Sequence, residues 1–198
     1  SSKDLCMFDY LDQLKDAGVD SVKIEGRMKS LYYTSVVTRS YRKALDYLAT
    51  HKPIKGPGGG PGIARFEPAA IEELRPYREE LYKISRREYS TGFYFGKRDA
   101  DDTTSKSYLR EYAFLGTVGQ QVEKGLYELN VKNQIRTSQE IEFIGPDLLF
   151  EKDSDFQLYD SNGGPVEQAD HGKEYYLRPS IPVDPGYIIR SAAGQQKR

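Results

Sequence analysis

Cysteine, tryptophan and histidine are nearly absent from this sequence, whose 198 residues include one Cys, no Trp and two His. One cysteine excludes an internal disulfide and a complete cysteine-built metal site within this chain. Charge of one sign is lacking too, since 29 basic residues face 30 acidic ones for a net charge of −1. This balance removes the bulk electrostatic case for a nucleic-acid binder, although a local basic patch is compatible with it.

Long apolar runs are also missing, and none approaches the roughly 20 residues of a membrane span. The N-terminus lacks the basic-then-apolar layout of a secretory signal. Aromatic residues, in contrast, are plentiful, and 16 Tyr with 8 Phe are too many for a disordered chain. We therefore expect a soluble, cytoplasmic protein of one or two domains with no membrane partner.

Residues 1–54 are expected to form a helix, a strand and a second helix. Leu11, Leu14 and Ala17 recur at helical spacing, and Gly18 follows where a left-handed C-terminal cap belongs. A β-type run covers 21–25, and Ser30 can cap the next helix. That helix has an apolar stripe (Tyr33, Val36, Val37, Tyr41, Ala44, Leu45 and Leu48) and a basic face expected in solvent (Arg39, Arg42 and Lys43).

This α-β-α alternation is typical of a slice of a parallel α/β structure. The strand at 21–25 has no neighbour to hydrogen-bond with, because no second β-α unit follows it in the sequence. The segment therefore looks like the end of something larger. A homodimer paired through strand 21–25 is a hypothesis, which a monomeric mass in light scattering would exclude.

The middle of the chain is expected to connect two structured parts. Residues 55–66 form a Gly/Pro-rich linker with too few side chains to pack. A phosphate-binding loop would need a strand before it and a helix with Lys-Ser/Thr after it, and the sequence has neither here. Residues 67–106 hold a helix that starts at Pro68 and that Pro76 should kink or divide, then an aromatic turn ending at Gly96. Adjacent carboxylates point apart on a helix, so we expect solvated faces for Glu72-Glu73, Glu79-Glu80 and Asp101-Asp102.

Residues 107–198 are expected to form a small antiparallel β-barrel. The apolar period changes from 3.6 to 2, and Asn162-Gly163-Gly164 is a strong turn signal. Short strands with few apolar residues favour a closed barrel over an open sheet, because closure removes exposed edges. The expected strands are 110–118, 126–132, 139–144, 156–159, 174–178 and 186–190. The predicted fold class is α+β.

Few residues are suited to hydrolytic chemistry. His51 and His171 stand in loop-like, solvated contexts. A Cys6–His51 dyad is conceivable by residue type, since a thiolate nucleophile needs an adjacent base, but nothing in the spacing supports it. By composition alone, Cys6 is a small packing residue.

The segment from Lys23 to Lys29 is the most informative candidate site. A short strand would bring Lys23, Glu25, Arg27 and Lys29 to its C-terminal end, where parallel α/β barrels place binding and catalytic groups. Residues 21–45 hold six basic side chains and one acidic one. An anionic ligand would suit this surface, and ordinary ion pairing with acidic groups elsewhere is an equal alternative. Glu25 could orient Arg27 through an ion pair or act as an acid–base group.

Four segments resemble peptidase family U32, historically described as collagenase-like proteases: Ser1–Met7, Gly18–Ser30, Tyr41–Ala44 and Arg87–Gly96. The resemblance implies that residues 1–54 are a truncated (β/α)-barrel remnant, whose missing N-terminal barrel would be a partner in a longer protein. It also implies that residues 107–198 are the family's C-terminal barrel, similar to those of translation factors.

The resemblance further implies a 4Fe–4S cluster in the full-length protein, with Cys6 as the fourth of four cysteine ligands. A cluster of this type normally needs four thiolates, so we expect no cluster and no metal in this chain alone. The implied parent is an oxygen-independent hydroxylase of a pyrimidine in tRNA or rRNA, with prephenate as hydroxyl source. The basic strand end would then face phosphate or the carboxylates of prephenate.

Two other functions are compatible with the sequence. A peptidase would need an activated nucleophile or a metal-bound water, and this segment offers neither convincingly. The barrel alone could bind RNA or a protein, although residues 106–198 hold 11 basic and 14 acidic side chains. We expect the isolated fragment to be inactive, since most of the implied barrel lies outside it.

Overall fold

The computed structural model describes residues 3–51, 68–96 and 108–193. It divides into two compact units, Ser1–Arg110 and Glu111–Arg198, named here the helical unit and the β unit. The predicted linker at 55–66 and the carboxylates Asp101 and Asp102 lie outside the described residues. Assignment of 1–54 to a barrel remnant and of 67–106 to a connecting segment stays a prediction. Within the described ranges, no helix has the length and apolarity to cross a membrane.

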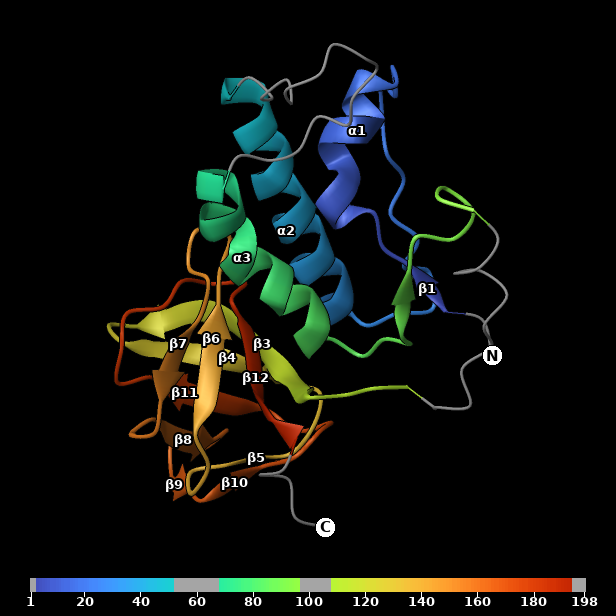
Figure 1. The fold of residues 1–198 in the computed structure, drawn as a ribbon. Coiled ribbons are helices and arrows are strands. Elements are labelled where there is room, and N and C mark those ends of the chain that lie inside the picture. The colour runs from blue at the N-terminus through green and yellow to red at the C-terminus, as the bar shows by residue number, and fades with distance from the viewer. Residues whose placement is uncertain (1–2, 52–67, 97–107, 194–198) are drawn as a thin grey trace. The chain divides into compact units, whose positions relative to one another are not determined.

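The described residues of the helical unit form a 3-10 helix, η1 (Phe8–Tyr10), and three α-helices, α1 (Leu11–Asp16), α2 (Leu31–Thr50) and α3 (Pro68–Lys83) (Figure 1). The predicted start of α2 is confirmed, because the Tyr33 N–H donates to Ser30 Oγ at 3.2 Å. The predicted cap after α1 is confirmed as well, since Gly18 has φ +83°. Pro76 lies inside α3 without dividing it.

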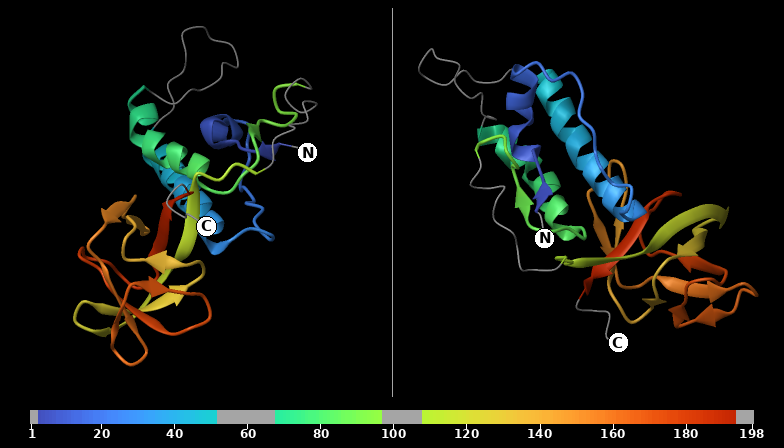
Figure 2. Two further views of the ribbon diagram at one scale, coloured as in Figure 1. Left: turned by 90° about the horizontal axis from the view of Figure 1, so that it is seen from below. Right: turned by 90° about the vertical axis from the view of Figure 1, so that its right-hand side faces the viewer.

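Helices α2 and α3 pack side by side (Figure 2), and this packing overturns two predictions about charged side chains. Arg39 was expected in solvent but is 9% exposed, and its guanidinium lies 3.3 Å from the Glu80 carboxylate. Glu80 was also expected on a solvated face but is fully buried. Because a buried charge needs a partner of opposite charge, the two side chains share one interior site between the helices.

The predicted strand at 21–25 is wrong, since residues 19–26 form neither helix nor strand. A strand requires a hydrogen-bonded neighbour, and this segment has none in the described parts of the chain. Two apolar side chains of the stretch 19–26 are exposed instead, Val19 at 43% and Val22 at 40%, while Ile24 is half-buried. In the described part of the unit, a parallel pairing is found between β1 (Asp4–Leu5) and β2 (Tyr89–Ser90).

The β unit is an antiparallel sheet that curls around one core, and its six predicted strands are all present. They are β3 (Tyr112–Glu123), β4 (Leu126–Val131), β6 (Ile141–Ile144), β8 (Gln157–Asp160), β11 (Tyr175–Arg178) and β12 (Ile188–Ala192). The eight-stranded order is β7-β6-β12-β3-β4-β11-β8-β9, with short edge strands β7 (Glu151–Asp153) and β9 (Pro165–Val166). The two edge strands, β7 and β9, do not pair with each other, so the curled sheet forms a half-barrel. A separate two-stranded ladder pairs β5 (Ile135–Arg136) with β10 (Gln168–Ala169).

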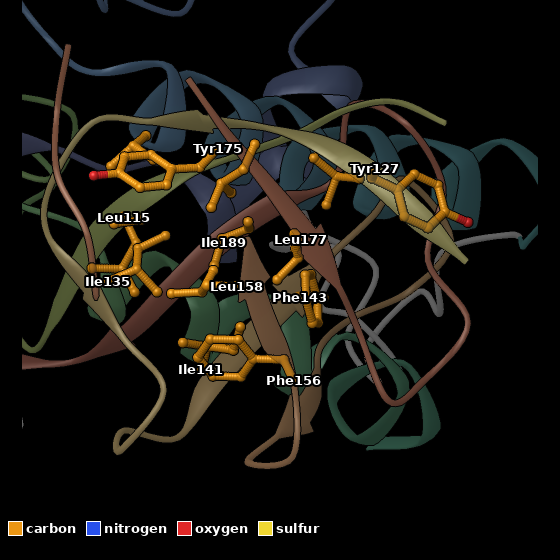
Figure 3. Packing of buried hydrophobic residues seen from close by; sticks show 14 of the residues in the cluster. Leu115, Tyr127, Ile135, Ile141, Phe143, Phe156, Leu158, Tyr175, Leu177 and Ile189 are labelled. Carbon is orange, nitrogen blue, oxygen red and sulfur yellow. The ribbon is translucent and has the colours of Figure 1, made fainter. Parts of the chain in front are cut away.

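The core of the β unit is filled by inward-facing aliphatic and aromatic side chains (Figure 3). Leu115, Ile135, Ile141, Phe143, Leu177 and Ile189 are completely buried. Strand β4 shows the alternation clearly, with Tyr127, Leu129 and Val131 buried and Glu128 and Asn130 exposed. In β4 the alternation that predicted the strand therefore also identified the core-facing positions, whereas β6 is buried at all four of its positions.

Candidate functional site

A cavity of about 490 Å³ lies within the helical unit. Its wall comes from residues 3–14, the unpaired stretch 19–25, Lys29, helix α2 and the residues around β2. The lining is mixed: apolar side chains such as Leu5, Leu14 and Val37 accompany the charged side chains of Lys3, Asp4 and Arg87. Concave sites of this size and mixed lining are typical of ligand pockets.

Asp4 is the charge centre of this cavity. Its carboxylate accepts hydrogen bonds from Arg87 Nε at 2.8 Å and from the Arg87 backbone N–H at 2.9 Å, while Lys29 Nζ lies 3.7 Å away. Burial alone would raise the pKa of Asp4, but the two hydrogen bonds from Arg87 and the charges of Lys29 and Arg87 bring it below its ordinary value. Asp4 is therefore ionised near neutral pH and holds both cations at the cavity wall.

Lys29 is the predicted site residue that the fold holds most firmly. Its Nζ lies 5.0 Å from the centre of the Tyr33 ring and 4.5 Å from that of Tyr108, and it donates to the Ser85 carbonyl oxygen at 3.4 Å. Aromatic faces attract an ammonium group through their quadrupole. Lys29 is thus a fixed cation in the cavity wall, held by contacts from distant parts of the sequence.

The other three residues of the predicted site are less constrained. Lys23 and Glu25 line the cavity and form an exposed ion pair at 3.8 Å. Glu25 contacts Arg27 through the backbone, because its Oε1 accepts from the Arg27 N–H at 2.9 Å. Arg27 is exposed and is not part of the cavity lining. The structure therefore gathers Lys23, Glu25 and Lys29 around one cavity and leaves Arg27 outside it.

Cys6 is held beside this cavity by Tyr41, which lines it. The Cys6 N–H donates to the Ser90 carbonyl oxygen at 3.0 Å, which continues the pairing of β1 with β2. Tyr41 Oη accepts from the Met7 N–H at 3.1 Å and lies 3.8 Å from Cys6 Sγ. Burial raises the pKa of Tyr41, so its hydroxyl keeps a proton that it can donate to the sulfur.

The residues of this chain do not fit a complete iron–sulfur cluster. A 4Fe–4S centre normally takes four thiolates, and the sequence supplies one cysteine. Burial raises the pKa of the Cys6 thiol above its ordinary value, which disfavours a free thiolate. Any cluster that used Cys6 would need three ligands from outside this chain.

The hydrogen bond from Tyr41 is expected to favour the Cys6 thiolate, because a donor stabilises the anion. Replacing Tyr41 by Phe should therefore raise the pKa of the thiol further. The pH dependence of iodoacetamide alkylation measures this, and the single cysteine makes the signal unambiguous. Tyr33→Phe is the matched control, since it removes a hydroxyl from the same helix and cavity. An alkylation midpoint that stays unchanged in Tyr41→Phe would show that this hydrogen bond does not act on the sulfur.

Neither histidine belongs to the lining of this cavity. His51 follows the last residue of α2, where its Nδ1 contacts the Tyr47 carbonyl oxygen at 3.0 Å and its ring stacks on Tyr47. It lies ten residues beyond Tyr41, about 15 Å along the helix, so the structure does not form a Cys6–His51 dyad. His171 contacts the Val131 carbonyl oxygen at 2.9 Å in the β unit.

Sequence reasoning missed Asp4, Arg87 and Tyr41 as parts of this site. The hydrogen-bonded pair Asp4 and Arg87 is separated by 83 residues, and no periodicity connects positions so far apart. The signal that was present is indirect: all three stand inside the segments that carry the family resemblance.

Relatives of known name match most of this chain. A "tRNA hydroxylation protein P1" from Bacillus subtilis is 26% identical over 174 residues, which cover 86% of this chain and 37% of that protein. A "tRNA hydroxylation protein P" from Haemophilus influenzae is 29% identical over 151 residues, 74% of this chain and 28% of that protein. A "Collagenase" from Porphyromonas gingivalis is 26% identical over 147 residues, 68% of this chain and 36% of that protein.

The chain thus spans between about a quarter and two fifths of the length of these relatives. Among solved structures, the C-terminal domain of a U32 peptidase from Geobacillus thermoleovorans is 24% identical to this chain, with a TM-score of 0.34. The match covers 40% of this chain and 99% of the solved domain. The model of "Peptidase family U32" matches residues 1–104, and that of "Peptidase family U32 C-terminal domain" matches residues 110–190. The chain belongs to peptidase family U32.

Proposed function

We propose that this chain is part of a longer protein that hydroxylates a pyrimidine in RNA, with tRNA as the favoured substrate and rRNA as the other. The observation that carries the proposal is the extent of the match to the two proteins named for tRNA hydroxylation. Their alignments cover 86% and 74% of the chain, and each is longer than either compact unit. The likeness therefore extends across both units.

The charges around the cavity support the same proposal. Lys3, Lys23, Lys29 and Arg87 contribute four cations to its lining, against the carboxylates of Asp4 and Glu25. A surplus of positive charge suits the phosphates of RNA or the carboxylates of a small co-substrate such as prephenate. Asp4 fixes the positions of Lys29 and Arg87 and offsets one of their two charges, so this part of the surface keeps a net positive charge.

Cys6 enters the proposal as one thiolate of a 4Fe–4S cluster that residues outside this chain would complete. Such a cluster, when present, would supply the redox chemistry of an oxygen-independent hydroxylation. The backbone bond to Ser90 and the contact with Tyr41 would position the sulfur at the cavity edge.

The peptidase alternative finds less support in this chain. An activated cysteine nucleophile needs a lowered pKa, usually from a neighbouring base, and the pKa of Cys6 is raised. In the ranges that the structure describes, no three His, Cys, Asp or Glu side chains cluster in a way that could hold a metal ion. Of the three relatives described above, the collagenase matches the smallest share of the chain.

The test uses the full-length protein in its host. Deleting the gene is expected to remove a hydroxylated pyrimidine nucleoside from total tRNA, detected by mass spectrometry as the loss of one oxygen atom. The wild-type protein should restore this nucleoside and Cys6→Ala should not. Purified without oxygen, the wild type should hold about four irons per chain and Cys6→Ala far fewer.

Each result separates the parts of the proposal. Unchanged tRNA and rRNA nucleosides after deletion, with gelatin cleavage by the purified protein, would overturn it in favour of the peptidase. Normal iron content in Cys6→Ala would reject this residue as a cluster ligand and leave the tRNA activity standing.

A further inference from the structure

We propose that Phe93 and Tyr94, on the turn beside the cavity, stack against an unpaired nucleobase of the RNA substrate. This inference rests on the proposed function, because it names the side chains that would hold the base. The phosphates next to that base would lie along the cationic lining of the cavity. The ligand class is therefore single-stranded RNA.

The geometry of the turn presents three consecutive aromatic side chains to solvent. Gly92 has φ +58° and Gly96 has φ +110°, so the chain bends sharply on both sides of Phe93, Tyr94 and Phe95. The Tyr94 N–H donates to the Thr91 carbonyl oxygen and the Gly96 N–H to that of Phe93, both at 3.3 Å. Hydrogen bonds within its own backbone thus help to hold the turn, while Phe93 and Tyr94 stay exposed.

The exposure of these rings is the observation that points to a ligand. Phe93 is 73% exposed and Tyr94 60%. Phe95 differs, because its ring packs on Tyr10 with a centroid distance of 4.7 Å. An exposed cluster of large aromatic side chains is unfavourable in water and commonly marks a binding surface.

The position of Tyr94 connects this exposed surface to the cavity. Tyr94 belongs to the cavity lining, together with Lys3, Lys23, Lys29 and Arg87. Stacking aromatics beside cations that follow a phosphate backbone are the usual means of binding single-stranded nucleic acid. A purely apolar protein partner would not require this charge, so the combination favours RNA over a protein surface.

The experiment measures binding of the whole 198-residue chain to a fluorescein-labelled oligouridine of roughly ten nucleotides by fluorescence anisotropy. The double variant Phe93→Leu/Tyr94→Leu keeps apolar bulk but removes both aromatic faces, so affinity should fall about tenfold or more. Tyr94→Phe keeps the face and should bind within about twofold of the wild type. Met28→Ala is the matched control, because it truncates an apolar side chain that is 91% exposed in the same unit.

Two outcomes would overturn the inference. Equal affinity of the Leu double variant and the wild type would show that the rings do not stack, and would point to an apolar protein partner instead. No binding of the oligouridine by the wild-type chain would reject the turn as an RNA site. Circular dichroism checks that each variant is folded, and the single Tyr94→Leu replaces the double variant if the latter is not.

The tRNA assay keeps this inference separate from the proposed function. If the full-length Phe93→Leu/Tyr94→Leu protein restores the hydroxylated nucleoside as well as the wild type, the stacking role falls and the proposed function stands. If gene deletion leaves the nucleosides unchanged, the proposed function itself falls.

Discussion

The substitution Glu142→Gln is expected to destabilise the β unit by about 3–5 kcal/mol, because it leaves a buried guanidinium without its counter-charge. Arg190 is completely buried and Glu142 is 4% exposed. Both Nε and one terminal nitrogen of Arg190 lie 2.7 Å from Glu142 Oε2. A Gln oxygen can accept a hydrogen bond at this place, but it carries no charge to offset that of Arg190.

The surroundings of the pair increase the expected effect. The Arg190 guanidinium lies 4.4 Å from the centre of the Tyr112 ring and 5.7 Å from that of Phe150, and the Tyr112 hydroxyl donates to Glu142 Oε1 at 3.4 Å. These aromatic rings limit the access of water to the charges. Electrostatic interactions are stronger where water is excluded, so loss of one partner costs more here than at the surface.

Glu123→Gln is the matched control, since it makes the same chemical change in an exposed ion pair. Glu123 Oε1 lies 3.0 Å from Arg178, with the two side chains 62% and 43% exposed. Pairs of this kind contribute about 0.2–1 kcal/mol. Native-state hydrogen exchange at the amides of β3 and β12 in the whole chain measures the stability of the β unit for both variants. Equal losses in both would show that burial does not strengthen the Arg190 pair.

The strands of the β unit could be predicted from the sequence because their pattern is local. Apolar and polar residues alternate over five or six positions, and turn residues such as Gly163, with φ +79°, separate the runs. The short strands β5, β7, β9 and β10 were not predicted, because two or three residues are too few to show a period. They are defined by their neighbours in space.

The errors in the helical unit share one physical cause, which is that each depends on a distant partner. Arg39 has the sequence context of a solvent-facing residue, and only the packing of α3 makes it buried beside Glu80. The run at 21–25 has the composition of a strand, yet it lacks a neighbour within the described chain. Local propensity cannot supply a pairing partner, so tertiary context decided both positions.

The candidate site was predicted in part for the same reason. The density of charge from Lys23 to Lys29 was visible along the chain, and it identified three residues of the cavity lining. The counter-charge on Asp4, the second cation on Arg87 and the hydroxyl of Tyr41 come from three other segments. Asp4 and Arg87 meet beside the parallel pairing of β1 with β2, which two-residue strands do not reveal in sequence, and Tyr41 comes from α2.

The second large expected effect concerns Gly116, in the middle of β3. Gly116 pairs with Val131 of β4 on one side and with Ile189 of β12 on the other. A Cβ added at Gly116 would overlap the Asn130 carbonyl oxygen and would lie 3.2 Å from the Asn130 carbonyl carbon and 3.3 Å from Val131 Cα. Gly116→Ala should therefore force β3 and β4 apart and destabilise the β unit by about 3 kcal/mol or more.

Gly164→Ala is the control for this prediction, because it adds the same methyl group in the same unit where space exists. Its Cβ would meet the Asp160 carboxylate at 3.4 Å, an ordinary contact, and the change should cost no more than about 0.5 kcal/mol. Hydrogen exchange at β3 and β4 compares the two variants. If Gly116→Ala is as stable as Gly164→Ala, strands β3 and β4 can separate at this position at little cost in free energy, and the prediction is wrong. The expected loss follows from backbone atoms on the neighbouring strand, which have no flexible side chain to move aside.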